Sequence, residues 1–143
     1  MGKLIKNKRV VCSTRDAGGF IALPWSVVDS PAYMNLSLSA KCLLIEIARQ
    51  YKADNNGRLI ATYSYLRKRG WVSADTITRA KRELINAGFI YETVMGHRPN
   101  KASRYALTFF TIDKLPGYDA GAYEGFQRSA YLKNKALKPM NGQ

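Results

Sequence analysis

Cysteine and histidine are scarce, so neither a metal centre nor a disulfide framework is expected. Of the 143 residues, two are cysteine and one is histidine. Cys12 and Cys42 lack the close spacing of metal ligands, and His97 has no second His or Cys beside it. A structural zinc site needs a full set of such ligands. We therefore expect no metal and two reduced thiols.

Long apolar runs are also absent. No run approaches the roughly 20 residues of a membrane-spanning helix, and the basic residues 1–6 lack the apolar segment of a secretory signal. We therefore expect no membrane partner and a cytoplasmic location.

Catalytic motifs are lacking as well. The glycines within residues 16–19 and 117–125 do not form the Gly-rich loop ending in Lys-Ser or Lys-Thr that binds phosphates. No acidic pair lies in an apolar run, where carboxyl pKa values would be raised, and His97 lies in a polar, turn-prone segment. We expect no enzyme and no cofactor. A tyrosine-based nuclease stays open, because nine tyrosines are present.

Acidic residues are few, and the basic surplus is informative. The chain has 23 Lys and Arg against 10 Asp and Glu, a net charge of +13. The bases form blocks: Lys3, Lys6, Lys8, Arg9 and Arg15 precede the first acid, Asp75 is the only acid between Arg58 and Arg82, and Arg128, Lys133, Lys135 and Lys138 follow the last acid, Glu124. Such blocks are typical of nucleic-acid-binding surfaces, because bound phosphates release counterions. A merely solvated basic surface is the plainer alternative.

In the first half of the chain, one helix is strongly indicated. Apolar residues at three- and four-residue spacing predict a helix over residues 39–51, capped by Ser39. Before it, Ser30 and Pro31 are a cap and first residue of a short helical turn. Residues 20–24 are compatible with a short extended stretch, and residues 58–61 with a brief strand.

Two more helices and a hairpin are predicted next. A helix over residues 63–69 ends at Gly70, apolar Trp71 and Val72 pack at the corner, and Ser73 caps a helix over residues 74–87 that ends at Gly88. Strand-forming residues 89–94 and 104–110 then enclose a polar, basic turn.

This order of elements is that of a winged helix domain. We expect an α+β fold, a winged helix-turn-helix with a three-helix core, a short strand and a C-terminal β-hairpin wing. Residues 1–19 would be a basic arm, 20–112 the winged helix domain and 113–143 a C-terminal extension. In that extension, Asp119 is a candidate cap for a helix over residues 120–137, with Tyr123, Phe126 and Ala130 facing inward.

The helix over residues 74–87 has two different faces. Its apolar residues, which should pack against the helix of residues 39–51, are Ile77, Ala80, Leu84 and Ala87. Polar residues at its start and on the other face can reach bases and phosphates: Ser73, Asp75, Thr76, Thr78, Arg79, Arg82 and Asn86. Asp75 either accepts a hydrogen bond from cytosine or, the preferred interpretation, serves the positive end of the helix dipole. The alternative is an ordinary amphipathic helix with a solvated face.

Two basic segments flank this helix. Arg67, Lys68 and Arg69 would contact phosphates without reading sequence. The turn of the hairpin would be the wing, and its candidate DNA-binding residues are His97, Arg98, Asn100 and Lys101. An exposed loop that is polar only because it is solvated is the alternative. The terminal arms add nonspecific affinity or are solvated tails.

Several blocks of sequence point the same way. They are residues 19–24, 29–33, 38–41, 55–58, 73–80 and 84–90, of which DSPAY at 29–33 and NNGR at 55–58, in that order, are the most specific. Over about residues 18–112 the chain resembles a widespread phage and plasmid helix-turn-helix family. The resemblance implies a winged helix fold and a mobile-element origin, in a family of replication-associated proteins and transcription regulators. Trp71 and the basic arms depart from its pattern.

Two functions are compatible with these observations. The first is sequence-specific binding of double-stranded DNA, as a transcriptional regulator or a replication-origin binder of a mobile element. The second is a phage-encoded interaction module or inhibitor that engages a host protein or an RNA–protein complex. A homodimer is compatible with helix-turn-helix proteins that read paired half-sites. Residues 113–143 would supply its contact or form a packed extension.

Overall fold

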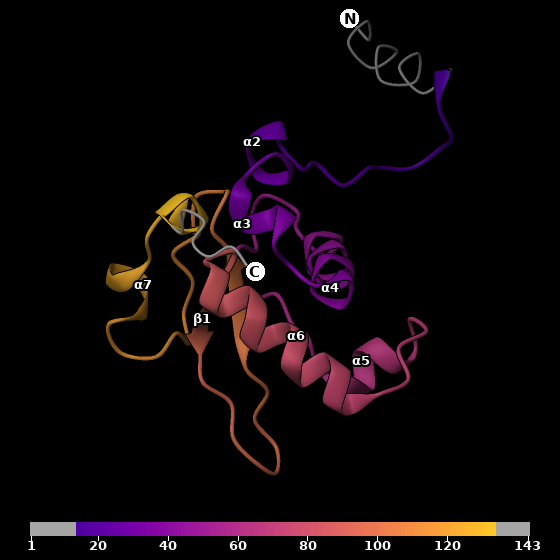
Figure 1. Cartoon of the computed structure of the whole chain (residues 1–143). Coiled ribbons are helices and arrows are strands. Elements are labelled where there is room, and N and C mark those ends of the chain that lie inside the picture. Colours follow the sequence, from indigo (N-terminus) through magenta and orange to yellow (C-terminus); the bar gives the residue numbers. More distant parts are fainter. Residues whose placement is uncertain (1–13, 134–143) are drawn as a thin grey trace, which may run out of the picture.

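The computed structural model describes residues 14–133, and this part of the chain is α+β. Its elements in chain order are α2 (Trp25–Val28), α3 (Pro31–Met34), α4 (Leu38–Ala48), α5 (Tyr63–Arg67), α6 (Ala74–Ala87), β1 (Ile90–Val94), β2 (Arg104–Leu107), α7 (Ala122–Gly125) and the 3-10 turn η2 (Ala130–Lys133). In Figure 1 the loop between β1 and β2 projects away from the helices. Within residues 14–133, no helix has the length and apolar content that crossing a bilayer requires. Most of the predicted N-terminal arm and the end of the extension lie outside the described residues.

The first helices differ in detail from the sequence-based prediction. Ser30 caps α3 as predicted, since its Oγ accepts a hydrogen bond from the amide of Tyr33 at 3.1 Å. Residues 20–24, predicted as a short extended stretch, pair with no strand, and Pro24 is extended where the chain enters α2. The predicted cap Ser39 is wrong. Ser37 caps α4 instead and accepts from the amide of Ala40 at 3.1 Å.

The helical pair before the hairpin is close to the prediction. α6 covers the predicted residues, with Ser73 as its cap and Gly88 at its end in the left-handed region (φ 88°). α5 ends earlier than predicted, at Arg67, and Thr62 caps it. Only Trp71 packs against the core at the corner. Val72 is 84% exposed, which corrects the prediction that both residues pack there.

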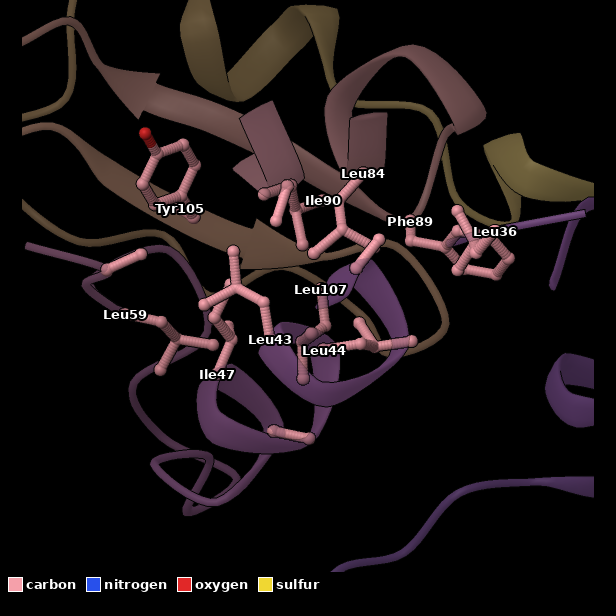
Figure 2. Packing of buried hydrophobic residues seen from close by; sticks show 14 of the residues in the cluster. Leu36, Leu43, Leu44, Ile47, Leu59, Leu84, Phe89, Ile90, Tyr105 and Leu107 are labelled. Atoms are coloured by element: carbon pink, nitrogen blue, oxygen red, sulfur yellow. The ribbon is translucent and has the colours of Figure 1, made fainter. Parts of the chain in front are cut away.

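The core lies between α4, α6 and the hairpin. Figure 2 shows Leu43, Leu44 and Ile47 of α4 gathered against Leu84 of α6 and Leu107 of β2. All five side chains are fully buried. The apolar faces predicted for both helices therefore meet, and this packing fixes which face of α6 is left outside.

The hairpin forms a two-stranded antiparallel sheet. Ile90 pairs with Leu107, and an irregularity follows Glu92. The brief strand predicted at residues 58–61 is reduced to one bridge, Leu59 with Tyr105. Since the Leu59 and Tyr105 side chains are both buried, this bridge ties the segment before α5 to the hairpin.

The chain after β2 does not form the predicted helix over residues 120–137. α7 has four residues, and Phe126 returns to an extended conformation. The reason is local: the left-handed Gly121 precedes α7 without a side-chain cap, and Asp119 accepts a hydrogen bond from the amide of Met95 at 2.7 Å instead of capping a helix. Residues 134–137 of that prediction lie outside the described residues.

This C-terminal segment packs onto its own chain. Tyr131 of η2 is buried and stacks on Phe89 with ring centroids 5.0 Å apart. The Tyr91 hydroxyl donates to the carbonyl of Ala122 at 2.8 Å. Of the residues inferred to face inward, Ala130, Tyr123 and Phe126 are half-buried. The residues up to Lys133 thus complete the core.

Candidate nucleic-acid interface

The outer face of α6 is polar and exposed. Ile77, Ala80 and Leu84 are buried on its inner face, and Ala87 is half-buried against the core. The predicted contact residues that are exposed on or next to α6 are Ser73, Asp75, Thr78, Arg79, Arg82 and Asn86, whereas Thr76 is half-buried. The structure therefore brings most of these candidates onto one solvent-facing surface.

Ser73 and Thr76 have a structural role at the start of α6. The Ser73 Oγ accepts from the amide of Thr76 at 3.1 Å, so its acceptor satisfies one of the open amides of the first turn. Thr76 borders a shallow hollow together with Leu38 and Trp71. These two residues therefore help to position α6, and this structural role takes precedence over a contact with a ligand.

Asp75 and Arg79 form an ion pair on the exposed face. The Arg79 Nε lies 3.1 Å from Asp75 Oδ2, and the side chains are 66% and 78% exposed. An exposed pair of this kind contributes less than about 1 kcal/mol, so an incoming phosphate can replace Asp75 as the partner of Arg79. Asp75 thus has a role not anticipated from the sequence, which is to orient Arg79. Arg82 makes no ion pair with any residue in 14–133.

The predicted basic run before the turn divides into two roles. Arg67 and Lys68 are exposed. Arg69 instead donates from Nε to Glu46 Oε1 at 2.8 Å, and this hydrogen bond, with the negative charge of Glu46, raises the pKa of Arg69. Trp71 Nε1 donates to the other oxygen of Glu46 at 3.4 Å. Glu46 on α4 therefore holds the turn between α5 and α6.

A second carboxylate fixes α6 to the start of α4. Glu83 accepts from the amide and from the hydroxyl of Ser37, both at 2.7 Å. On the same helix, burial lowers the pKa of Lys81, while Glu92 opposes that shift. Sequence periodicity did not predict the contact between Glu83 and Ser37, because the two residues are 46 positions apart in the chain.

The loop between β1 and β2 has an ordered tip. His97 and Lys101 exchange backbone hydrogen bonds at 2.8 and 2.9 Å, and the amide of Gly96 donates to Ser103 Oγ at 2.9 Å. The four predicted wing residues, His97, Arg98, Asn100 and Lys101, are all exposed. The backbone contacts close the tip of the loop, which projects away from the helices (Figure 1).

Comparison with known proteins gives no relative from which a role could be transferred. No protein family matches the chain, and no curated protein or solved structure matches it either. Within residues 14–133, no three His, Cys, Asp or Glu side chains come together as a metal site. The case for a function therefore depends on the geometry and charge of α6 and the hairpin.

Proposed function

We propose that this chain is a DNA-binding protein with a winged helix domain, in which α6 enters the major groove and the loop between β1 and β2 is the wing. The observation that carries the proposal is the two-faced α6, buried on one side by α4 and open on the other with Thr78, Arg79 and Arg82. A helix presented in this way, beside a basic hairpin, is the arrangement that winged helix proteins use.

Charge supports the same proposal. The net charge of +13 attracts a polyanion from a distance, and phosphates that bind release condensed counterions. The guanidinium group of arginine makes paired hydrogen bonds with guanine, and the side-chain amide of asparagine does so with adenine. The sequence blocks that resemble phage and plasmid helix-turn-helix proteins support a mobile-element role, either regulating transcription or binding a replication origin.

The test is affinity for duplex DNA after single substitutions on α6. Fragments bound from a pool of random duplexes supply the preferred sequence. Arg82→Ala and Arg79→Ala should each weaken binding to it by about 1–3 kcal/mol, measured by fluorescence anisotropy. Arg49→Ala is the matched control, because Arg49 is exposed at the end of α4, beside residues 17–21. Equal affinity of all three variants and the unchanged chain would contradict the proposal.

A second candidate function, engagement of a host protein or RNA–protein complex, has one observation in its favour. Trp25 and Phe20 are 80% and 74% exposed near the start of the described chain. Exposed aromatic side chains are enriched at protein interfaces. Pull-down before and after nuclease treatment separates the candidates, since a partner that survives nuclease and is lost in Trp25→Ala favours this second function over DNA binding.

A further inference from the structure

A basic hollow of about 470 Å³ lies at the hairpin, apart from the exposed face of α6. Three positively charged side chains line it, Arg58, Lys101 and Arg104, together with Asn100 and the segment from Pro116 to Tyr118. Only Lys101 and Asn100 were candidate contact residues from the sequence. Arg58 and Arg104 are far apart in sequence and are brought together by the fold.

Strand pairing places the two arginines on the outer face of the sheet. Leu59 pairs with Tyr105, and both side chains are buried in the core. Because side chains alternate along extended chain, the adjacent residues Arg58 and Arg104 point to the opposite face, where the segment after β2 runs. Arg58 contacts that segment directly, since its Nη2 donates to the carbonyl of Pro116 at 2.9 Å.

The basic side chains of this hollow have no acidic partner within it. None of the residues that line it is acidic, and neither Arg58, Lys101 nor Arg104 forms an ion pair with another residue in 14–133. Like charges gathered on one surface repel each other, so binding of an anion stabilises the arrangement. The hydrogen bond to Pro116 orients the Arg58 guanidinium and uses only part of its donor set.

We propose that this hollow is a second anion site, which binds a phosphate group. Guanidinium groups match the geometry of phosphate oxygens through paired N–H donors, and a lysine adds a compact charge. The volume falls in the range of ligand pockets, about 300–1,000 Å³, so it admits a phosphate with its attached sugar. The phosphate belongs either to a nucleic-acid backbone or to a free phosphorylated small molecule. The first source depends on the proposed DNA binding and the second does not.

Titration of the full chain with inorganic pyrophosphate tests the site. At constant ionic strength, amide signals of residues 100–104, Gly117 and Tyr118 should shift and saturate in a ¹H–¹⁵N NMR spectrum. Arg104→Gln should weaken this binding about tenfold or more, the loss expected for one charge-assisted hydrogen bond. Arg104 is exposed and no intramolecular hydrogen bond of its side chain is found within residues 14–133, so this variant should fold. Arg58→Gln tests the second arginine of the hollow by the same measurement, and its pyrophosphate affinity should also fall.

Control experiments separate a site from general screening. Sodium acetate at the same ionic strength should leave these amides unshifted, and Arg49→Gln should leave pyrophosphate affinity unchanged. The phosphate site is overturned if pyrophosphate produces no saturable shift there, if acetate reproduces the shifts, or if both hollow variants bind pyrophosphate like the unchanged chain.

A parallel titration with a short mixed-sequence DNA duplex identifies the source. If the backbone supplies the phosphate, the same amides shift with DNA, and Arg104→Gln reduces the log–log salt slope of DNA binding by about one. If a free phosphorylated molecule supplies it, only pyrophosphate shifts them. Arg82→Ala should leave pyrophosphate binding intact, so failure of DNA binding and failure of this site are observed separately.

Discussion

At the scale of the residue, Asn56 joins several segments of the fold through hydrogen bonds. It is fully buried. Its Oδ1 accepts from the amide of Leu107 at 2.8 Å, and its Nδ2 donates to the carbonyls of Leu107 and Thr111, each at 3.0 Å. Its backbone amide donates to Asp113 Oδ2 at 2.9 Å. One side chain thus joins the turn after α4 to the end of the hairpin and the segment that follows.

Replacing Asn56 with alanine should strongly destabilise the protein. The change removes the side-chain partner of the buried amide and carbonyl of Leu107 and of the part-buried carbonyl of Thr111. A buried group left unsatisfied costs about 1–3 kcal/mol. We expect the free energy of unfolding, measured by urea denaturation, to fall by about 3 kcal/mol. Asn35→Ala is the control, because Asn35 is exposed at the end of α3. A loss for Asn56→Ala as small as that of the control would contradict this role.

Tyr105 predicts how stability changes at alkaline pH. Burial raises the pKa of the Tyr105 phenol above 10.0, the charge of Glu92 adds to the rise, and a hydrogen bond with Ser103 opposes it. The unfolded chain therefore loses this proton first as pH rises. Stability is then fully present below about pH 10 and is lost as pH rises through the folded-state pKa.

The measurement is urea denaturation between about pH 9 and pH 11. Tyr105→Phe should reduce the fall in unfolding free energy over that interval. Tyr51 and Tyr118 also have raised pKa values, mainly through burial, so part of the fall should persist in the variant. An identical pH dependence in the variant and the unchanged chain would show that Tyr105 does not contribute.

These residue roles could not be predicted from the sequence alone. Asn56 lies in a run of residues that predicts a turn, and it does lie in the turn after α4. Its hydrogen-bond partners, however, come from the far end of the hairpin. Arg69 and Lys68 look alike in sequence, yet only Arg69 meets Glu46. Which of several neighbouring bases is occupied within the protein depends on tertiary contacts.

At the scale of the element, local signals predicted α6 fully and α4 only in part. Ser73, the apolar stripe and Gly88 all act within the helix or next to it, so its bounds follow from the sequence. The start of α4 depends on Glu83, which holds Ser37 from another helix. The C-terminal segment is shaped by Asp119 and Tyr131 contacting the hairpin and the core, which no local pattern reveals.

The contact between Glu83 and Ser37 should stabilise the pairing of α4 with α6. A carboxylate that accepts two hydrogen bonds at a helix N-terminus also interacts favourably with the helix dipole. Glu83→Gln should lower the free energy of unfolding by about 1 kcal/mol. Glu124→Gln is the matched control, because Glu124 is exposed in α7. Equal stability of the two variants would mean that the contact adds nothing measurable.

At the scale of the whole molecule, charge is distributed over more than one surface. The face of α6, the hairpin loop and the hollow beside Arg58 and Arg104 each present bases. The sequence predicted the first two, since they lie in polar segments of a recognisable order of elements. The third arises from the pairing of Leu59 with Tyr105, which the sequence indicated only as a brief strand.

A duplex bound by these surfaces should be sensitive to salt. If five to eight phosphates are contacted, the affinity should fall with salt at a log–log slope of about −4 to −7. Fluorescence anisotropy of a labelled duplex at several salt concentrations measures this slope. A slope near zero would mean that the basic surplus takes no part in binding.

The most direct test of the central claim is to map where a duplex touches the chain. Amide signals of the full chain should be followed by ¹H–¹⁵N NMR as a short mixed-sequence DNA duplex is added. DNA binding by α6 and the wing predicts the largest shifts at residues 73–82 and at the wing amides of His97, Arg98, Asn100 and Lys101. If the signals of both segments do not shift, or if the only shifts lie around Phe20 and Trp25, the proposed DNA binding by α6 and the wing is contradicted.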